Sequence, residues 1–216
     1  MMSETIIQAE NVYKQFKNRE ILKGINFSAS RGEIIAICGK NGSGKTVFMR
    51  ILCGLIKANK GKITVFGQEV GIEVEFPEST GIHFESSGLL LSENAFENLY
   101  LLSLINGKAD GNRIKSIIQQ VGLDPEDHRP VSVYSTGMRQ RLGIAQALMH
   151  DPDLILLDEP VNGLDFAGQE QFRDLLCNLH GDGKTVIFTS HNKEEIRDIA
   201  TRALEMVDGR MKPYSE

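Results

Sequence analysis

The stretch Gly39-Lys40-Asn41-Gly42-Ser43-Gly44-Lys45-Thr46 decides how the rest of this 216-residue chain is interpreted. It has the P-loop spacing, in which a glycine and four further residues precede Gly-Lys-Thr. An apolar run at 34–38 comes before it, and apolar side chains recur at helical spacing from Val47 to Ile56 after it. A strand, a glycine-rich turn and a helix in this order predict a loop that binds phosphate groups.

Each residue type in this stretch has a use in phosphate binding. Glycines let backbone N–H groups close around phosphate oxygens, and the helix N-terminus adds the positive end of a dipole. Lys45 can neutralise charge on the β- and γ-phosphates, and the Thr46 hydroxyl can ligate Mg²⁺. Val47 has no hydroxyl, so only its backbone N–H can help. The expected nucleotide-binding set is Gly39, Lys40, Asn41, Gly42, Ser43, Gly44, Lys45, Thr46 and Val47.

A second apolar run, at 154–157, ends in the two carboxylates Asp158 and Glu159. A buried strand that ends in acids places them at the carboxyl edge of a sheet, where open α/β sheets bind ligands. Asp158 suits the role of holding Mg²⁺ through its water shell. Glu159 is then free to orient and polarise an attacking water. The alternative is that the two acids only begin a loop, which is common in sequences without a P-loop.

The order of apolar runs predicts an α/β fold. The runs at 34–38, 154–157 and 186–189 are nearly all apolar rather than alternating, which is typical of parallel strands covered by helices on both faces. Strand signals stop between about 85 and 135, so we expect a helical insert there. The expected strands are 6–9, 25–28, 34–38, 63–66, 81–84, 154–157, 186–189 and 204–207, and the expected helices are 95–105, 113–121, 138–149, 169–179 and 193–201.

Composition excludes several classes of protein. The net charge is -5 and Lys and Arg are scattered among acids, which argues against a nucleic-acid partner. No apolar run approaches the roughly 20 residues that span a bilayer, so we expect any membrane role to come through a partner. Cys38, Cys53 and Cys177 have neither metal-like nor disulfide-like spacing, and each lies in an apolar run. We expect all three to be small buried hydrophobes.

Three further motifs carry a resemblance to a known family. Tyr134-Ser135-Thr136-Gly137-Met138 resembles the ABC signature, normally Leu-Ser-Gly-Gly-Gln, with Ser135 and Gly137 kept. Asn162-Gly163-Leu164-Asp165 resembles the D-loop of the same family, and Thr189-Ser190-His191 resembles the strand end that carries its switch histidine. In this order, over essentially its whole length, the chain is similar to the ATP-binding subunits of ABC transporters.

The resemblance implies a RecA-like P-loop core with a mostly parallel sheet, a small antiparallel β-subdomain and a helical insert. The core and β-subdomain would be 1–84 and 136–216, and the helical subdomain 85–135. The cofactors implied are ATP and Mg²⁺, with two ATP molecules held head-to-tail between two such subunits, identical or sister. Ser135 and Gly137 of one subunit would then face the P-loop of the other. A separate transmembrane permease subunit would hold the pair at the inner face of the cell membrane.

The resemblance also assigns roles to single residues. His191 would bridge the γ-phosphate and the catalytic water. Phe16 would stack on adenine, and the family's spacing favours it over Tyr13; the alternative is that Phe16 is a core aromatic at a strand end. The remaining histidines have no such context: His83, His128, His150 and His180.

Glu85 is the informative departure from the family pattern. It stands where the family usually has a glutamine that contacts Mg²⁺ and the water, and no glutamine lies between Glu69 and Ile118. A glutamate there, with Tyr-Ser-x-Gly-Met at the signature, resembles the exporters of antibiotics and bacteriocin-type peptides. We therefore expect an ATPase that powers export, with Glu85 as a metal ligand; otherwise Glu85 only begins a loop. The alternatives are an import ATPase, or a non-transport ABC ATPase acting on ribosomes or DNA.

Overall fold

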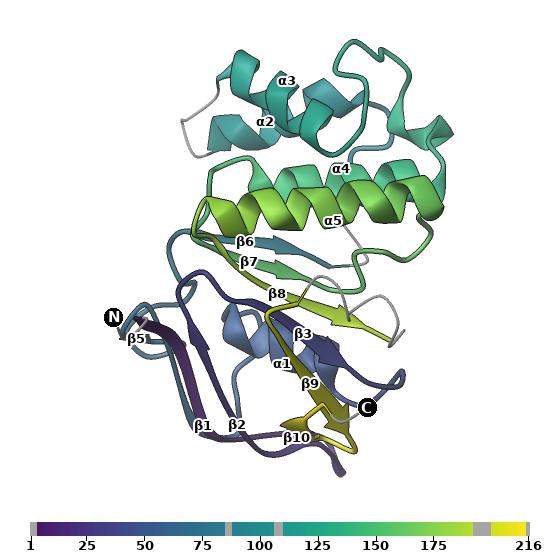
Figure 1. Cartoon of the computed structure of the whole chain (residues 1–216). Helices are drawn as coiled ribbons and strands as arrows, with labels where there is room; N and C mark the ends of the chain where they lie inside the picture. Colours follow the sequence, from purple (N-terminus) through teal and green to yellow (C-terminus); the bar gives the residue numbers. More distant parts are fainter. Residues whose placement is uncertain (1–3, 85–87, 106–109, 192–199, 215–216) are drawn as a thin grey trace.

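The computed structural model describes residues 4–84, 88–105, 110–191 and 200–214 (Figure 1). Its larger sheet has six strands in the order β10-β9-β3-β8-β7-β6. The strands β3, β8, β7, β6 and β9 pair in parallel, and only β10 runs antiparallel, against β9. The bounds are β3 (Ile34–Cys38), β6 (Thr80–His83), β7 (Leu154–Leu157), β8 (Thr185–Ser190), β9 (Arg202–Val207) and β10 (Arg210–Pro213). The mostly parallel sheet that the sequence predicts is confirmed.

The central strands are apolar on both sides because both faces of the sheet are covered. Ile34, Ala36 and Cys38 belong to the core beneath helices α4 (Thr136–Leu148) and α5 (Phe166–Gly181). Ile35 and Ile37, which point the other way, belong to a second core with helix α1 (Lys45–Leu52). Figure 1 shows α4 and α5 on one side of the sheet and α1 on the other. The strand pattern therefore follows from two apolar layers.

A smaller antiparallel sheet lies beyond α1, in the order β2-β1-β4-β5. Its strands are β1 (Thr5–Phe16), β2 (Arg19–Ser30), β4 (Lys60–Val65) and β5 (Gln68–Glu69). The first two are much longer than the apolar runs predict, because pairing continues through polar residues such as Lys14 opposite Leu22 and Gln15 opposite Glu20. Strand β5 was not predicted, since two residues carry no periodicity.

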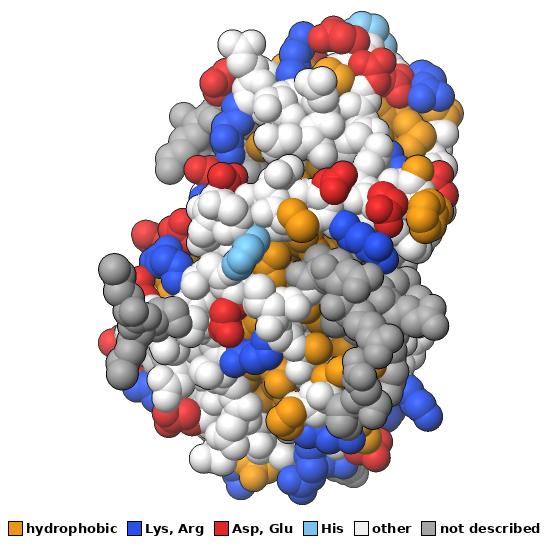
Figure 2. Space-filling model, viewed as in Figure 1, with side chains coloured by type: hydrophobic (Ala, Val, Ile, Leu, Met, Phe, Trp, Pro, Cys, Tyr) orange, Lys and Arg blue, Asp and Glu red, His pale blue; other side chains and the backbone are white. Residues whose placement is uncertain are grey.

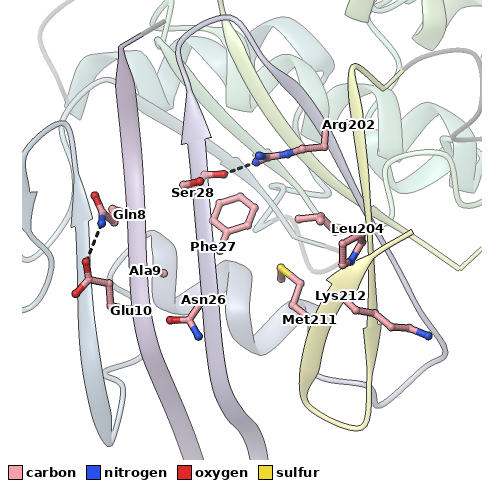
Figure 3. Close-up of a pocket in the computed structure, with 11 residues that line it drawn as sticks. Gln8, Ala9, Glu10, Asn26, Phe27, Ser28, Arg202, Leu204, Met211 and Lys212 are labelled. Atoms are coloured by element: carbon pink, nitrogen blue, oxygen red, sulfur yellow. Dashed lines mark hydrogen bonds between the residues drawn. The ribbon is translucent and has the colours of Figure 1, made fainter. Parts of the chain in front are cut away.

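The two sheets approach each other along β2 and the β9–β10 hairpin. The Lys23 N–H donates to the Gly209 carbonyl over 2.8 Å. Further along, the Arg202 guanidinium lies 5.8 Å from the centre of the Phe27 ring and donates to the Ser28 carbonyl (Figure 3). The open groove between these strands has a volume of about 450 Å³ and contains no P-loop residue. We interpret it as a seam between the sheets.

Along the chain, the segment between β6 and α4 forms three helices. They are α2 (Ala95–Ile105), α3 (Gly111–Gln120) and the short η1 (Val131–Val133). Within the described part of this segment no strand occurs. Helix α2 has the predicted bounds, and α3 begins two residues early because Asp110 caps it by accepting from the Asn112 N–H. The subdomain boundaries at 85 and 135 stay a prediction. The expected helix at 193–201 falls almost entirely outside the described residues.

The prediction for the cysteines is confirmed for two of them. Cys38 and Cys53 are buried, and burial raises the pKa of the Cys53 thiol. Cys177 is exposed, so the prediction for it was wrong: it occupies the solvent side of α5, whose core side carries Phe172, Leu175 and Leu176.

On the face shown in Figure 2, side chains of both charge signs occur over the upper and lower parts of the molecule.

Candidate nucleotide-binding and hydrolysis site

The P-loop connects the end of β3 to the start of α1, as predicted. Its backbone needs glycine at Gly39, Gly42 and Gly44, whose φ angles are +155°, +79° and +112°. A Cβ on Gly39 would also lie 2.4 Å from the Met206 carbonyl oxygen. Lys40 and Asn41 are exposed, whereas Thr46 and Val47 are half-buried. The loop is therefore a tight backbone turn that ends in the free N–H groups of a helix N-terminus.

Lys45 points into this turn. Its side chain is 5% exposed, and its Nζ donates to the Gly39 carbonyl over 2.6 Å. The same Nζ lies 3.1 Å from Glu159 Oε1. The buried cation thus faces a carboxylate at the position where the sequence predicts phosphate oxygens.

Asp158 lies at the end of β7 and is 4% exposed. The Thr46 hydroxyl donates to its Oδ2 over 2.7 Å, which brings the two predicted metal ligands together. The Thr189 hydroxyl, on β8, donates to Oδ1 over 2.6 Å and accepts from the Glu159 N–H over 2.9 Å. Sequence reasoning assigned no role to Thr189. Its hydroxyl fixes both residues of the acidic pair.

Glu159 stands at the centre of the site. Its backbone has a φ of +49°, which is uncommon for a residue with a side chain. The carboxylate reaches Lys45 on one side, and its Oε2 lies 2.8 Å from His191 Nδ1 on the other. The Gln140 side chain, on α4, donates to the Glu159 carbonyl over 3.0 Å. Two predicted catalytic residues, Glu159 and His191, are therefore in direct contact.

The described residues fit a nucleotide with Mg²⁺. The hydroxyl of Thr46 and the carboxylate of Asp158 are hard oxygen ligands of the kind Mg²⁺ prefers. No group of three His, Cys, Asp or Glu suited to a metal occurs among the described residues, so phosphate oxygens and waters would complete the shell. The Ser43 hydroxyl is buried beside Gly39 and makes no hydrogen bond to a described residue. A phosphate oxygen in the loop would supply that partner.

The signature residues begin helix α4. Ser135 is its N-cap, and the Ser135 hydroxyl accepts from the Met138 N–H over 3.2 Å. A Cβ on Gly137 would lie 2.8 Å from the Gly163 carbonyl oxygen, so the predicted D-loop packs closely on the signature. No hydrogen bond joins Ser135 or Gly137 to the P-loop among the described residues. Ser135 is instead exposed, with its hydroxyl at the helix N-terminus.

Phe16 ends β1 and is 45% exposed, so the alternative that it is a core aromatic is wrong. The Lys14 ammonium lies 4.9 Å from the centre of its ring. Stacking on adenine stays a prediction. Glu85, the predicted metal ligand, lies outside the described residues, and its role also stays a prediction.

A P-loop lysine that faces an Asp-Glu pair at the end of another strand of the same parallel sheet defines a P-loop nucleotide-binding protein. Residues 22–162 match the family described as ABC transporter. The chain belongs to this family, as an ABC transporter ATP-binding protein.

The chain is 41% identical to the ABC transporter ATP-binding protein YybJ of Bacillus subtilis (strain 168), over 95% of this chain and 94% of the relative. It is 36% identical to the bacitracin transport ATP-binding protein BcrA of Enterococcus faecalis, over 93% of this chain and 66% of the relative. The bacitracin transport relative confirms the predicted resemblance to the antibiotic branch. A dimeric bacterial ABC transporter cassette, MJ0796, has a TM-score of 0.86 at 25% identity and covers 98% of this chain and 100% of its own. Among the described helices none is both long and apolar enough to cross a membrane.

Proposed function

We propose that this chain hydrolyses Mg²⁺-ATP as one member of a pair of ATP-binding subunits and thereby powers export through a separate membrane permease. The observation that carries the proposal is the contact network in which Glu159 touches both Lys45 and His191, beside the Thr46–Asp158 pair. These are the groups that phosphoryl transfer to water requires: a cation, a place for the metal, and a base.

The site residues divide the work as follows. When ATP enters, the Lys45 ammonium leaves the Glu159 carboxylate and binds phosphate oxygens instead. Thr46 and Asp158 would hold Mg²⁺, which neutralises phosphate charge. The freed Glu159 carboxylate then accepts a proton from the water that attacks the γ-phosphate. The bond from the γ-phosphorus to the bridging oxygen breaks and ADP leaves, while His191 contacts both the γ-phosphate and this water.

A second subunit completes the site. The exposed Ser135 and the N-terminus of α4 offer hydrogen-bond donors and a positive dipole end. Among the described residues, no hydrogen bond joins them to the P-loop of the same chain. A neighbouring P-loop with its γ-phosphate suits them. The dimeric cassette MJ0796 supports such a pairing.

Helix α2 supports the proposal of a membrane partner, because it exposes a row of apolar side chains. They are Tyr100, Leu101, Leu104 and Ile105. Contiguous exposed apolar surface is typical of a site that binds another protein. We place this row against the permease at the inner face of the membrane. Export, rather than import, is supported by the likeness to the bacitracin transport protein and by Glu85. The transported compounds would be amphiphilic antibiotics or bacteriocin-type peptides.

The test is reconstitution of the chain in proteoliposomes with the membrane protein that co-purifies with it from its own cells. We expect Mg²⁺-dependent phosphate release and movement of a fluorescent bacitracin-type peptide toward the face opposite the ATPase. The Lys45→Ala chain, reconstituted in the same way, should do neither. Peptide movement toward the ATPase face would contradict export, and the absence of ATP-dependent phosphate release would contradict the whole proposal.

A further inference from the structure

His83 is a buried histidine with no role in the site as described. It is the last residue of β6 and is 3% exposed. Its backbone carbonyl accepts from the Asp158 N–H over 2.9 Å, so it lies beside the metal-binding end of β7. Both ring nitrogens are buried, and neither makes a hydrogen bond of ordinary geometry to a described residue. Burial of the ring lowers the pKa of His83.

The imidazole fills a space that a glycine on α4 leaves free. A Cβ on Gly143 would lie 2.2 Å from the His83 Cε1 and 2.4 Å from its Nδ1. Gly143 has an ordinary helical backbone, and a glycine in a helix interior is less favourable than alanine. The contact therefore combines two unfavourable choices, a helix-interior glycine and a buried polar ring. Such local costs concentrate where function requires them.

Gln140 connects this ring to the catalytic carboxylate. It lies about one helical turn before Gly143 on α4 and is largely buried. The nearby Gln140 side chain raises the pKa of His83, against the larger lowering by burial, and its Nε2 donates to the Glu159 carbonyl over 3.0 Å. The Glu159 backbone has a φ of +49°, a conformation that neighbouring contacts must hold.

We propose that His83 is a positioning residue for Glu159. The imidazole orients the Gln140 side chain, and Gln140 holds the Glu159 backbone so that the carboxylate points at the site of the attacking water. The inference rests on the proposed role of Glu159 in hydrolysis. It also joins α4, which carries Ser135 at its start, to the water-activating carboxylate at the end of β7. A shift of α4 when a partner subunit binds at Ser135 would then reach Glu159 through Gln140.

The main test compares His83→Leu, Gln140→Leu and the double variant by steady-state ATPase kinetics, with ATP affinity measured by a fluorescent ATP analogue. We expect each single change to lower kcat about fivefold to tenfold, the size of losing one polar contact beside the reacting groups, with little change in ATP affinity. Because both residues act in one chain of contacts, the double variant should be no slower than the slower single one. His83→Asn, which keeps a polar group near the Nδ1 position, should recover most of kcat.

A second pair of variants separates positioning from the filling of space. Gly143→Ala should destabilise the fold through its clash with the ring, and Gly143→Ala with His83→Ala should restore thermal stability. If that stable double variant is as slow as His83→Leu, the positioning role is supported. If it has wild-type kcat, or if His83→Leu does, His83 only fills space and the inference fails. A wild-type chain that hydrolyses no ATP would contradict the proposed function and this inference together.

Discussion

Glu159 can keep both of its partners only until ATP enters the site. Its carboxylate lies against Lys45 in a largely buried ion pair and against His191. A triphosphate brings stronger negative charge to the same lysine, so ATP binding must replace this ion pair. The carboxylate therefore competes with the nucleotide for Lys45.

The first prediction concerns that competition. Glu159→Gln removes the competing charge and the base, so ATP should bind at least as tightly, while hydrolysis falls by about 100-fold or more. Lys45→Ala removes the cation and should lose ATP binding. Equilibrium binding of a fluorescent ATP analogue and phosphate release measure the two effects. Glu170→Gln, which removes an exposed carboxylate on α5, is the control and should match wild type in both assays. Wild-type turnover by Glu159→Gln would contradict the assignment.

The second prediction concerns Phe16. Replacing an aromatic ring that stacks on a base weakens binding by about 1–3 kcal/mol, so Phe16→Ala should raise the Kd for ATP accordingly, and Phe16→Trp should not. Because the side chain is half exposed, the melting temperature should change little. An unchanged Kd in the alanine variant would show that adenine binds elsewhere.

At this scale, sequence spacing could find the groups proposed to act on phosphate, but not the residues that hold those groups in position. Lys45, Thr46, Asp158 and Glu159 stand in two motifs that can be read locally, and the structure brings them together. Thr189 could not be found this way, because its contact with Asp158 depends on the register in which Leu157 pairs with Phe188. His83 and Gln140 were missed for the same reason, since their contacts cross from a strand to a helix.

Among the elements, those with a strong apolar pattern were predictable. Strands β3 and β7 and helix α2 have the predicted bounds. Strand β10 was missed, because Arg210–Pro213 is largely polar and pairs only at the sheet edge with β9. Helix α4 begins two residues before the first apolar position that predicted it, because Ser135 caps it. Caps and edge pairing are backbone features that periodicity does not record.

The third prediction separates the two roles of Ser135. Ser135→Ala removes the cap of α4 and should cost about 1 kcal/mol of stability. Ser135→Asp keeps a capping oxygen and adds a negative charge that suits a helix N-terminus, so stability should be kept. The same charge would repel a partner's γ-phosphate. In an otherwise Glu159→Gln chain, ATP-dependent dimer formation should therefore be lost with aspartate, as size-exclusion chromatography would show. An intact dimer would mean that Ser135 is only a cap.

For the whole molecule, strand order makes the site. The adjacent strands β3, β8 and β7 end at one edge, and this brings the P-loop together with the Asp158–Glu159 pair and His191, which follow it by more than 100 residues. Local patterns predicted each of these strands, but not the order in which they lie in the sheet. The same topology leaves Ser135 on the surface, where under the proposed function it would meet the P-loop of a second subunit.

The last prediction concerns the apolar row on α2. Ile105 is 79% exposed, and a lysine there would place a charge in the proposed contact with the permease without touching the nucleotide site. Ile105→Lys should therefore keep the basal ATPase rate and lose most of the stimulation by the reconstituted membrane partner. The matched control is Ile72→Lys, because Ile72 is 77% exposed on a different element and its replacement adds the same charge. Equal stimulation of both variants would move the permease contact away from α2, whereas a lower basal rate in Ile105→Lys alone would mean that α2 affects hydrolysis within the chain itself.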